Sequence, residues 1–323
     1  MKAWQTILIV AILVTVVVIA GTVAYYDFFA KKRLRISTTT SLYDTGLLDE
    51  VKKQYEATHN VDIQIISAGT GIALQQAQAG DADIVLVHSP AQEQTFLTNG
   101  YGVARKIVAY NYFTIVGPAS DPAGISGKNA TEALKSILAY GRTRTSAVWV
   151  SRGDNSGTFS KEQSLWASAG YNQTVISGES WYATTGSGMA NTINVADQKN
   201  SYTLADVGTY LSQQDTLSLE SIVNGGKSLL NVYSVMAVNP AKVGNVSFSD
   251  AVDFIKWLVS DTGQQVISSF GVADYSQSLF YGAVQPLKEG TPQPDVSWIQ
   301  SYAFFNGTEC PLQYRGDHPE LYP

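Results

Sequence analysis

The sequence predicts an α/β fold of two lobes, and three observations lead to this prediction. Short apolar runs alternate with segments whose apolar residues recur at helical spacing, which is typical of a parallel sheet covered by helices. Residues 84–87 are wholly apolar, as expected for a central parallel strand that is buried on both faces. Two apolar segments that begin with tyrosine and end at proline, residues 112–118 and 233–240, predict a pair of crossing strands that form a hinge.

The crossing strands divide the chain into a discontinuous first lobe and an inserted second lobe. We expect lobe 1 to comprise residues 34–118 and 230–285, and lobe 2 to comprise residues 119–229. Residues 286–323 are rich in proline, glycine and aromatic residues, and they predict an irregular C-terminal tail. The alternative is that the two strands are unrelated. We favour the hinge because loops of one chemical kind lie on both sides of it.

The N-terminal residues 1–33 predict a membrane anchor or a signal segment. Residues 7–24 carry no charge, and their length suits either a short spanning helix or a secretory signal. Basic residues between positions 31 and 35 would place the following domain in the cytoplasm on a strict charge count. We nevertheless expect export, because long domains translocate largely regardless of flanking charge. The chain is therefore predicted to be extracytoplasmic, and either anchored at the cell surface or secreted.

The composition excludes several classes of function. A net charge of −6 argues against nucleic-acid binding, which needs a basic face. A single cysteine allows no internal disulfide. The three histidines, His59, His88 and His318, are far apart and lack the spacing of metal ligands, so we expect them to be surface or packing residues. We predict neither a cofactor nor a metal site.

The segment from Ser151 to Thr158 carries the clearest functional signal. It follows the apolar run 147–150 and precedes a predicted helix at residues 156–169, so it forms a strand-to-helix turn. The first N–H groups of a helix lack internal partners and lie at the positive end of its dipole, which suits them to bind an anion. Arg152 adds a planar cation beside this turn. We therefore expect the turn to bind a small oxyanion.

Three further Ser/Thr/Gly-rich loops lie between a strand and a helix, at residues 38–41, 67–71 and 186–189. A capped helix start would explain each loop separately, because serine and threonine are good caps. Together, the loops supply many N–H and O–H donors and little equipment for acid–base catalysis. This favours a binding protein over an enzyme. Asp154 is expected either to orient Arg152 or to accept a proton from a protonated ligand, so these residues leave the identity of the anion open.

These loops resemble those of the substrate-binding proteins of tungstate uptake ABC transporters, which have the type II periplasmic-binding-protein fold. The resemblance spans residues 34–285 and rests on the Ser/Thr run 37–41, the loops 67–71 and 186–189, the Arg-containing motif 151–158, and residues 202–206. It implies capture of an oxyanion in a cleft between the lobes, with tungstate preferred and molybdate as a close competitor. Tungsten would be bound as its oxyanion, without direct coordination by the protein. The implied partners are a membrane permease and its ATPase.

The resemblance also implies a set of ligand-binding residues. Arg152 would be the cationic ligand. The hydroxyl and amide donors would be Thr39, Thr40, Ser41, Ser67, Thr70, Ser156, Gly157, Thr158 and Ser187.

Other readings remain open at this point. Phosphate, sulfate or molybdate would suit the same donors. An enzyme that uses the loops as an oxyanion hole would need a nucleophile and a base within hydrogen-bonding reach of each other. A membrane-tethered domain that senses the anion is a third possibility.

Overall fold

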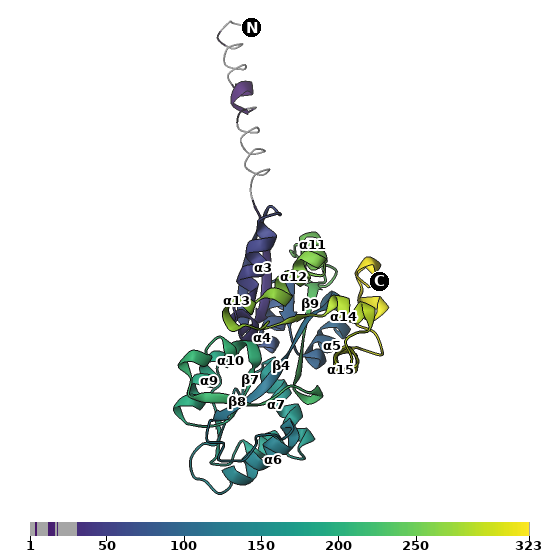
Figure 1. Cartoon of the computed structure of the whole chain (residues 1–323). Coiled ribbons are helices and arrows are strands. Elements are labelled where there is room, and N and C mark those ends of the chain that lie inside the picture. The colour runs from purple at the N-terminus through teal and green to yellow at the C-terminus, as the bar shows by residue number, and fades with distance from the viewer. Residues whose placement is uncertain (1–3, 5–11, 17, 19–30, 323) are drawn as a thin grey trace.

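The computed structural model describes residue 4, residues 12–16, residue 18 and residues 31–322 (Figure 1). Most of the expected N-terminal anchor or signal segment, residues 1–33, lies outside this part of the chain. Within it, no helix has both the length and the apolar character needed to cross a membrane.

The sheet of the first lobe contains the strand order β10-β4-β9-β3-β1-β2. Strands β1 and β2 pair in parallel, as do β1 and β3, whereas β9 is antiparallel to both β3 and β4. The central strand β3 is buried along its whole length, as its apolar sequence predicts. The strand bounds are β1 Lys32–Thr39, β2 Val61–Ala68, β3 Ile84–Val87, β4 Gly102–Pro118, β9 Leu230–Val238 and β10 Tyr281–Gly282.

The second lobe is built on the far half of β4. This half pairs antiparallel with β7 (Thr203–Asp206) and β8 (Leu219–Asn224). Strands β5 (Trp149–Ser151) and β6 (Tyr182–Thr184) pair in parallel, and a bridge from Trp149 to Tyr202 joins them to the segment that leads into β7.

Helices cover both sheets (Figure 1). Those of the first lobe are α2 Thr40–Tyr43, α3 Leu47–Glu56, α4 Thr70–Ala79, α5 Pro90–Thr98, α11 Phe248–Leu258, α12 Asp261–Ser269 and α13 Val272–Tyr275. Those of the second lobe are α6 Ala130–Gly141, α7 Gly157–Ser168, α8 Gln173–Ile176, α9 Met189–Gln198 and α10 Val207–Leu211, with 3₁₀ turns at Gln214–Thr216 and Lys227–Leu229. Helices α2, α4, α7, α9 and α10 each begin within a few residues of the end of a strand, as the Ser/Thr/Gly-rich loops predict.

Strands β4 and β9 form the predicted pair of crossing strands. They run antiparallel, with Asn111 opposite Asn231 and Tyr112 opposite Leu230. Beyond this point Phe113 and Ile115 pack in the core of the second lobe together with Trp149 and other apolar side chains. The chain therefore passes from one lobe to the other along β4 and returns along β9.

The prediction of an irregular C-terminal tail is wrong in part. Residues 284–322 form α14 (Val284–Glu289), α15 (Asp295–Ala303) and two 3₁₀ turns, at Leu312–Tyr314 and Pro319–Leu321. The prolines and glycines of this segment obscured a short helical pattern, since Val296, Ile299 and Ala303 recur on one face and are buried.

Glu309 ties this C-terminal segment to β4. Its carboxylate pairs with Lys106 Nζ at 2.7 Å and accepts a hydrogen bond from the backbone N–H of Ile107, while its carbonyl oxygen accepts from Arg105 Nη1 at 2.6 Å. The segment is therefore packed on the first lobe.

Candidate oxyanion site between the lobes

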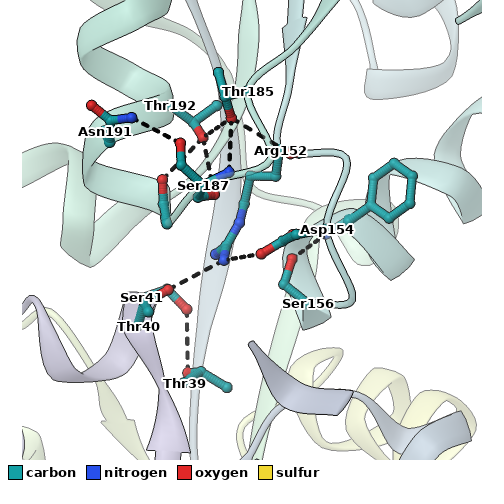
Figure 2. A network of polar contacts seen from close by, with 12 residues as sticks. Thr39, Thr40, Ser41, Arg152, Asp154, Ser156, Thr185, Ser187, Asn191 and Thr192 are labelled. Carbon is teal, nitrogen blue, oxygen red and sulfur yellow. Dashed lines mark hydrogen bonds and ion pairs between the residues drawn. The ribbon is translucent and has the colours of Figure 1, made fainter. Parts of the chain in front are cut away.

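Arg152 lies at the centre of the candidate site, with its side chain only 2% exposed (Figure 2). It follows β5 directly, so the strand carries it to the edge of the second lobe. Its Nη2 pairs with Asp154 Oδ2 at 2.6 Å and donates to Thr40 Oγ1 of the first lobe at 3.2 Å. The Arg152–Asp154 pair has no net charge, so this site offers an anion directed donors and little excess positive charge.

Buried polar atoms without a partner are concentrated at this site. Among the described residues, six buried side-chain nitrogen or oxygen atoms make no hydrogen bond, and five of them belong to the predicted loops. The five are Arg152 Nε, Arg152 Nη1, Thr70 Oγ1, Thr158 Oγ1 and Asp154 Oδ1. A buried polar group without a partner costs roughly 1–3 kcal/mol, so such a cluster indicates that a polar ligand completes these hydrogen bonds.

The beginnings of helices α4, α7 and α9 surround these atoms. Gly69 and Gly188, the residues that precede α4 and α9, have no side chain to cap the first turn, so no side-chain cap satisfies the first N–H groups there. Ser156 caps α7 by accepting a hydrogen bond from the N–H of Phe159 at 3.1 Å. Its own hydroxyl proton remains free to point at an anion.

His88, a residue that we expected only to pack or to lie on the surface, determines the direction of two hydroxyl groups. Its Nδ1 lies 2.8 Å from Asn231 Oδ1, and Asn231 Nδ2 faces acceptors on Asn111 and Asp206. The amide oxygen of Asn231 must therefore accept a proton from His88 Nδ1, which leaves His88 Nε2 as an acceptor. Ser41 Oγ, at 3.2 Å, donates to this nitrogen.

The direction of the Thr39 hydroxyl proton follows from the same hydrogen bonds. It lies 3.3 Å from Ser41 Oγ, whose own proton is directed at His88, so Thr39 donates to Ser41. Thr39 and Ser41 therefore have no hydroxyl proton left for a ligand. Their backbone N–H groups take no part in this series of side-chain hydrogen bonds. Thr40 differs, because its oxygen accepts from Arg152 and its proton remains free.

His88 is unprotonated at neutral pH. Burial and the positive charges of Arg152 and Lys161 lower the pKa of His88 to about 4, against a hydrogen bond with Asn231 that raises it. His88 is therefore neutral, which agrees with its role as an acceptor. Within the described part of the chain, no group of three or more His, Cys, Asp or Glu residues is placed to hold a metal ion.

Several contacts hold the two lobes together around the site. The N–H of Gly71, in the first turn of α4, donates to the carbonyl oxygen of Asn155 at 2.8 Å. Gly157 lies so close to His88 that an added Cβ would be 2.8 Å from His88 Nε2. The structure is therefore that of a closed arrangement, in which the loops of both lobes are in contact.

Asp44 makes one more contact between the lobes. Its carboxylate faces the N–H of Ala190 in the first turn of α9. Burial raises the pKa of Asp44, and the charge of Arg152 and the N–H of Ala190 oppose this rise. A carboxylate at a helix N-terminus is favourably placed, so Asp44 stabilises the closed arrangement.

Two predicted site residues lie apart from this cluster. Ser67 is exposed at the end of β2. Ser187 is half-buried, and its hydroxyl accepts from Asn191 Nδ2 at 2.8 Å, on the far side of the loop from the Arg152 guanidinium (Figure 2). The loop that contains Ser187 supports the backbone of Arg152 instead, since the N–H of Gly186 donates to the Arg152 carbonyl at 2.8 Å.

Comparison with known proteins identifies the class of this protein. A family model described as "PBP superfamily domain" matches residues 29–262, and the chain belongs to this superfamily of periplasmic binding proteins. Its two lobes, crossing strands and interlobe site have the type II arrangement of that superfamily.

More particular similarities are to anion-binding proteins. The chain is 44% identical over 259 residues to a Haloferax volcanii protein provisionally named an ABC transporter anion-binding protein, with 78% of this chain and 73% of the relative covered. It is 37% identical over 254 residues to the tungstate-binding protein TupA of Peptoclostridium acidaminophilum, with 78% and 86% covered. The solved structure of TupA from Desulfovibrio alaskensis G20 is similar with a TM-score of 0.66 and 40% identity, over 78% of this chain and 98% of that one.

Proposed function

We propose that this protein captures tungstate between its two lobes, with molybdate as a close competitor, as the extracytoplasmic component of an ABC importer. The observation that carries the proposal is the cluster of unpartnered donors, Arg152 Nε and Nη1, Thr70 Oγ1 and Thr158 Oγ1, at adjoining helix beginnings. A tetrahedral dianion has four oxygens and would complete these hydrogen bonds. The names of the relatives point to the same ligand.

The directions of the hydroxyl protons refine the predicted ligand set. We propose that Arg152 and the hydroxyls of Thr40, Thr70, Ser156 and Thr158 donate to the anion. Backbone N–H groups at the starts of α2, α4, α7 and α9 would complete the shell, including those of Thr39, Ser41 and Gly157. Ser67 would contribute only if the loops rearrange.

The remaining functional proposals concern location and assembly. We propose that residues 1–33 export the chain or anchor it at the cell surface, and that a permease and its ATPase receive the anion. We also propose that residues 34–118 and 230–285 form lobe 1 and that residues 119–229 form lobe 2. The lobes would open about β4 and β9 and close on the ligand.

Asp154 supports a second candidate ligand, hydrogen phosphate. Its Oδ1 is a buried acceptor without a partner, and such an atom favours a ligand oxygen that carries a proton. Tungstate has no proton at neutral pH, whereas hydrogen phosphate has one.

Titration calorimetry with tungstate, molybdate, sulfate and phosphate tests the proposal. We expect one tungstate to bind per chain, molybdate to compete with it, and Arg152→Ala to weaken binding strongly. The Asp154→Asn variant separates the two ligands, because it should abolish preference for a protonated anion without weakening tungstate binding. Strong binding of phosphate that Asp154→Asn removes would overturn the assignment to tungstate.

A further inference from the structure

Lys161 is a buried cation on the helix that begins at the anion site. It lies on α7, three residues after Thr158, so the two side chains are neighbours on the helix surface. The side chain is 5% exposed. Its Nζ donates to the carbonyl oxygen of Leu230 at 2.8 Å and lies over the rings of Tyr302, at 4.3 Å, and Phe113, at 5.9 Å.

Lys161 differs from the other buried cations because it has no acidic partner. Arg105 pairs with Glu93 at 2.8 Å, and Lys106 pairs with Glu309 at 2.7 Å. Lys161 makes no such ion pair with any described residue and contacts only a carbonyl oxygen and aromatic faces. Burial lowers the pKa of Lys161 to about 8. A buried charge is costly without a counter-charge, so this site is incomplete as it stands.

The neighbouring acid is committed elsewhere. Glu162 accepts hydrogen bonds from Trp149 Nε1 at 2.9 Å and Ser151 Oγ at 2.7 Å, in addition to Trp166 and Tyr182. Burial raises the pKa of Glu162, and these four donors oppose that rise. Glu162 therefore faces the core of the second lobe and does not neutralise Lys161.

The other charged or titratable groups near Lys161 come from three elements. Lys128 and Glu132 flank or belong to α6, Lys227 follows β8, and Tyr302 belongs to α15, and all four line the same cavity as Lys161. Burial raises the pKa of Tyr302, so its hydroxyl stays neutral. Glu132 caps its own helix through the N–H of Asn129 and is exposed.

The charge of Lys161 reaches the anion site through Phe113 and His88. The Phe113 ring stacks on the His88 ring with 6.0 Å between centroids, and His88 contacts Ser41 and abuts Gly157. The positive charge of Lys161 favours the neutral form of His88. The intervening groups are apolar or neutral, and they screen the field little compared with water.

We propose that Lys161 is a second cationic determinant of oxyanion affinity, which acts through space on the bound anion without touching it. The inference rests on the proposed function and deepens it. Asp154 neutralises Arg152, so a dianion enters a site whose own charges cancel. Lys161 then supplies uncompensated positive charge behind the N-terminus of α7, where a bound dianion becomes its missing counter-charge.

Three variants and a pH series test this inference, with tungstate as the probe. Lys161→Met should bind tungstate about tenfold more weakly, since it removes a poorly screened unit charge. Lys161→Arg should keep most of the affinity. Lys135→Met is the matched control, because Lys135 is an exposed lysine on α6 of the same lobe, and it should bind as the wild type does. Thermal unfolding of each unliganded variant reports whether it folds.

The pH series needs no variant. A bound anion raises the pKa of Lys161 above its unliganded value of about 8. Affinity should therefore be constant below this pH and fall by up to about tenfold per unit above it, until the pKa of the bound state is passed. Lys161→Arg should remain flat over the same range.

Equal affinity of Lys161→Met and the wild type, or a wild-type affinity that stays flat from pH 7 to about pH 9.5, would overturn the role of Lys161 and leave tungstate capture standing. A wild-type protein that binds no tungstate at any pH would instead overturn the proposed function.

Discussion

Individual hydroxyl groups at this site are not equivalent, although the sequence presents them as one class. Thr39 and Ser41 direct their protons along a chain that ends at neutral His88. Thr70 and Thr158 have no partner at all. The difference depends on the Asn231 amide of β9, which fixes the His88 tautomer from a position 143 residues away along the chain. A ligand therefore meets two kinds of hydroxyl group, those with a proton free to donate and those whose proton is already donated within the protein.

This difference predicts which hydroxyl variants lose the most affinity for tungstate. Thr158→Val keeps the shape of the side chain and removes its donor, so it should weaken tungstate binding by about 1.5–3 kcal/mol, the usual value for a hydrogen bond to a charged group. Ser41→Ala should have a much smaller effect on affinity. Calorimetric titration of both variants checks the ranking, and a larger loss for Ser41→Ala would show that the assigned proton directions are wrong.

At the scale of elements, the role of the α7 N-terminus depends on its close approach to the first lobe as much as on its helix dipole. Gly157 allows the N-terminus of this second-lobe helix to lie against His88 of the first lobe. His88 is buried and hydrogen-bonded on both ring nitrogens, so it has little freedom to move aside. A side chain at position 157 would therefore oppose closure of the lobes.

Gly157→Ala should weaken tungstate binding by about 1–3 kcal/mol, the usual cost of overpacking. It should hardly change the thermal unfolding of the unliganded protein, which can remain open. Gly244→Ala is the matched control, since the structure leaves open space around Gly244. An unaltered affinity for Gly157→Ala, measured beside this control, would contradict the close contact between α7 and His88.

We expect the C-terminal segment to stabilise the folded protein through Glu309. Glu309→Ala should lower the free energy of unfolding by about 3–5 kcal/mol, because it leaves buried Lys106 without a counter-charge and Ile107 without an acceptor. Glu320→Ala is the comparison, since the ion pairs of Glu320 are exposed and should contribute little. Urea unfolding measures both variants. Equal stability of the two would show that the segment is not held by Glu309.

The elements that could be predicted from sequence are those whose signals are local. The strand-to-helix loops and the crossing strands were predicted correctly, because caps, glycines and apolar runs act over a few residues. His88 and Asp44 were missed as site residues, because they reach the site only through the approach of the two lobes. Only His88 carried a signal, since it follows directly on the buried strand β3. The helix α15 was missed because prolines and glycines dominate its surroundings.

At the scale of the whole molecule, the protein and its proposed ligand both carry a net negative charge. The chain carries a net charge of −6, and Asp154 neutralises the cation at the centre of its site. Direct contacts to the anion must therefore come mostly from oriented N–H and O–H donors, enclosed by lobe closure, where a low local dielectric strengthens each bond and the field of Lys161 acts from a distance. The crossing strands matter because they let donors from both lobes meet on one anion.

The most direct test of this claim is a crystal structure of the tungstate complex, with the metal located by its anomalous scattering. We predict a single tungsten peak whose oxygens lie within hydrogen-bonding distance of Arg152, Thr70 and Thr158. A tungsten peak outside the interlobe site, or an anion held mainly by other cations while these donors remain without partners, would contradict the account.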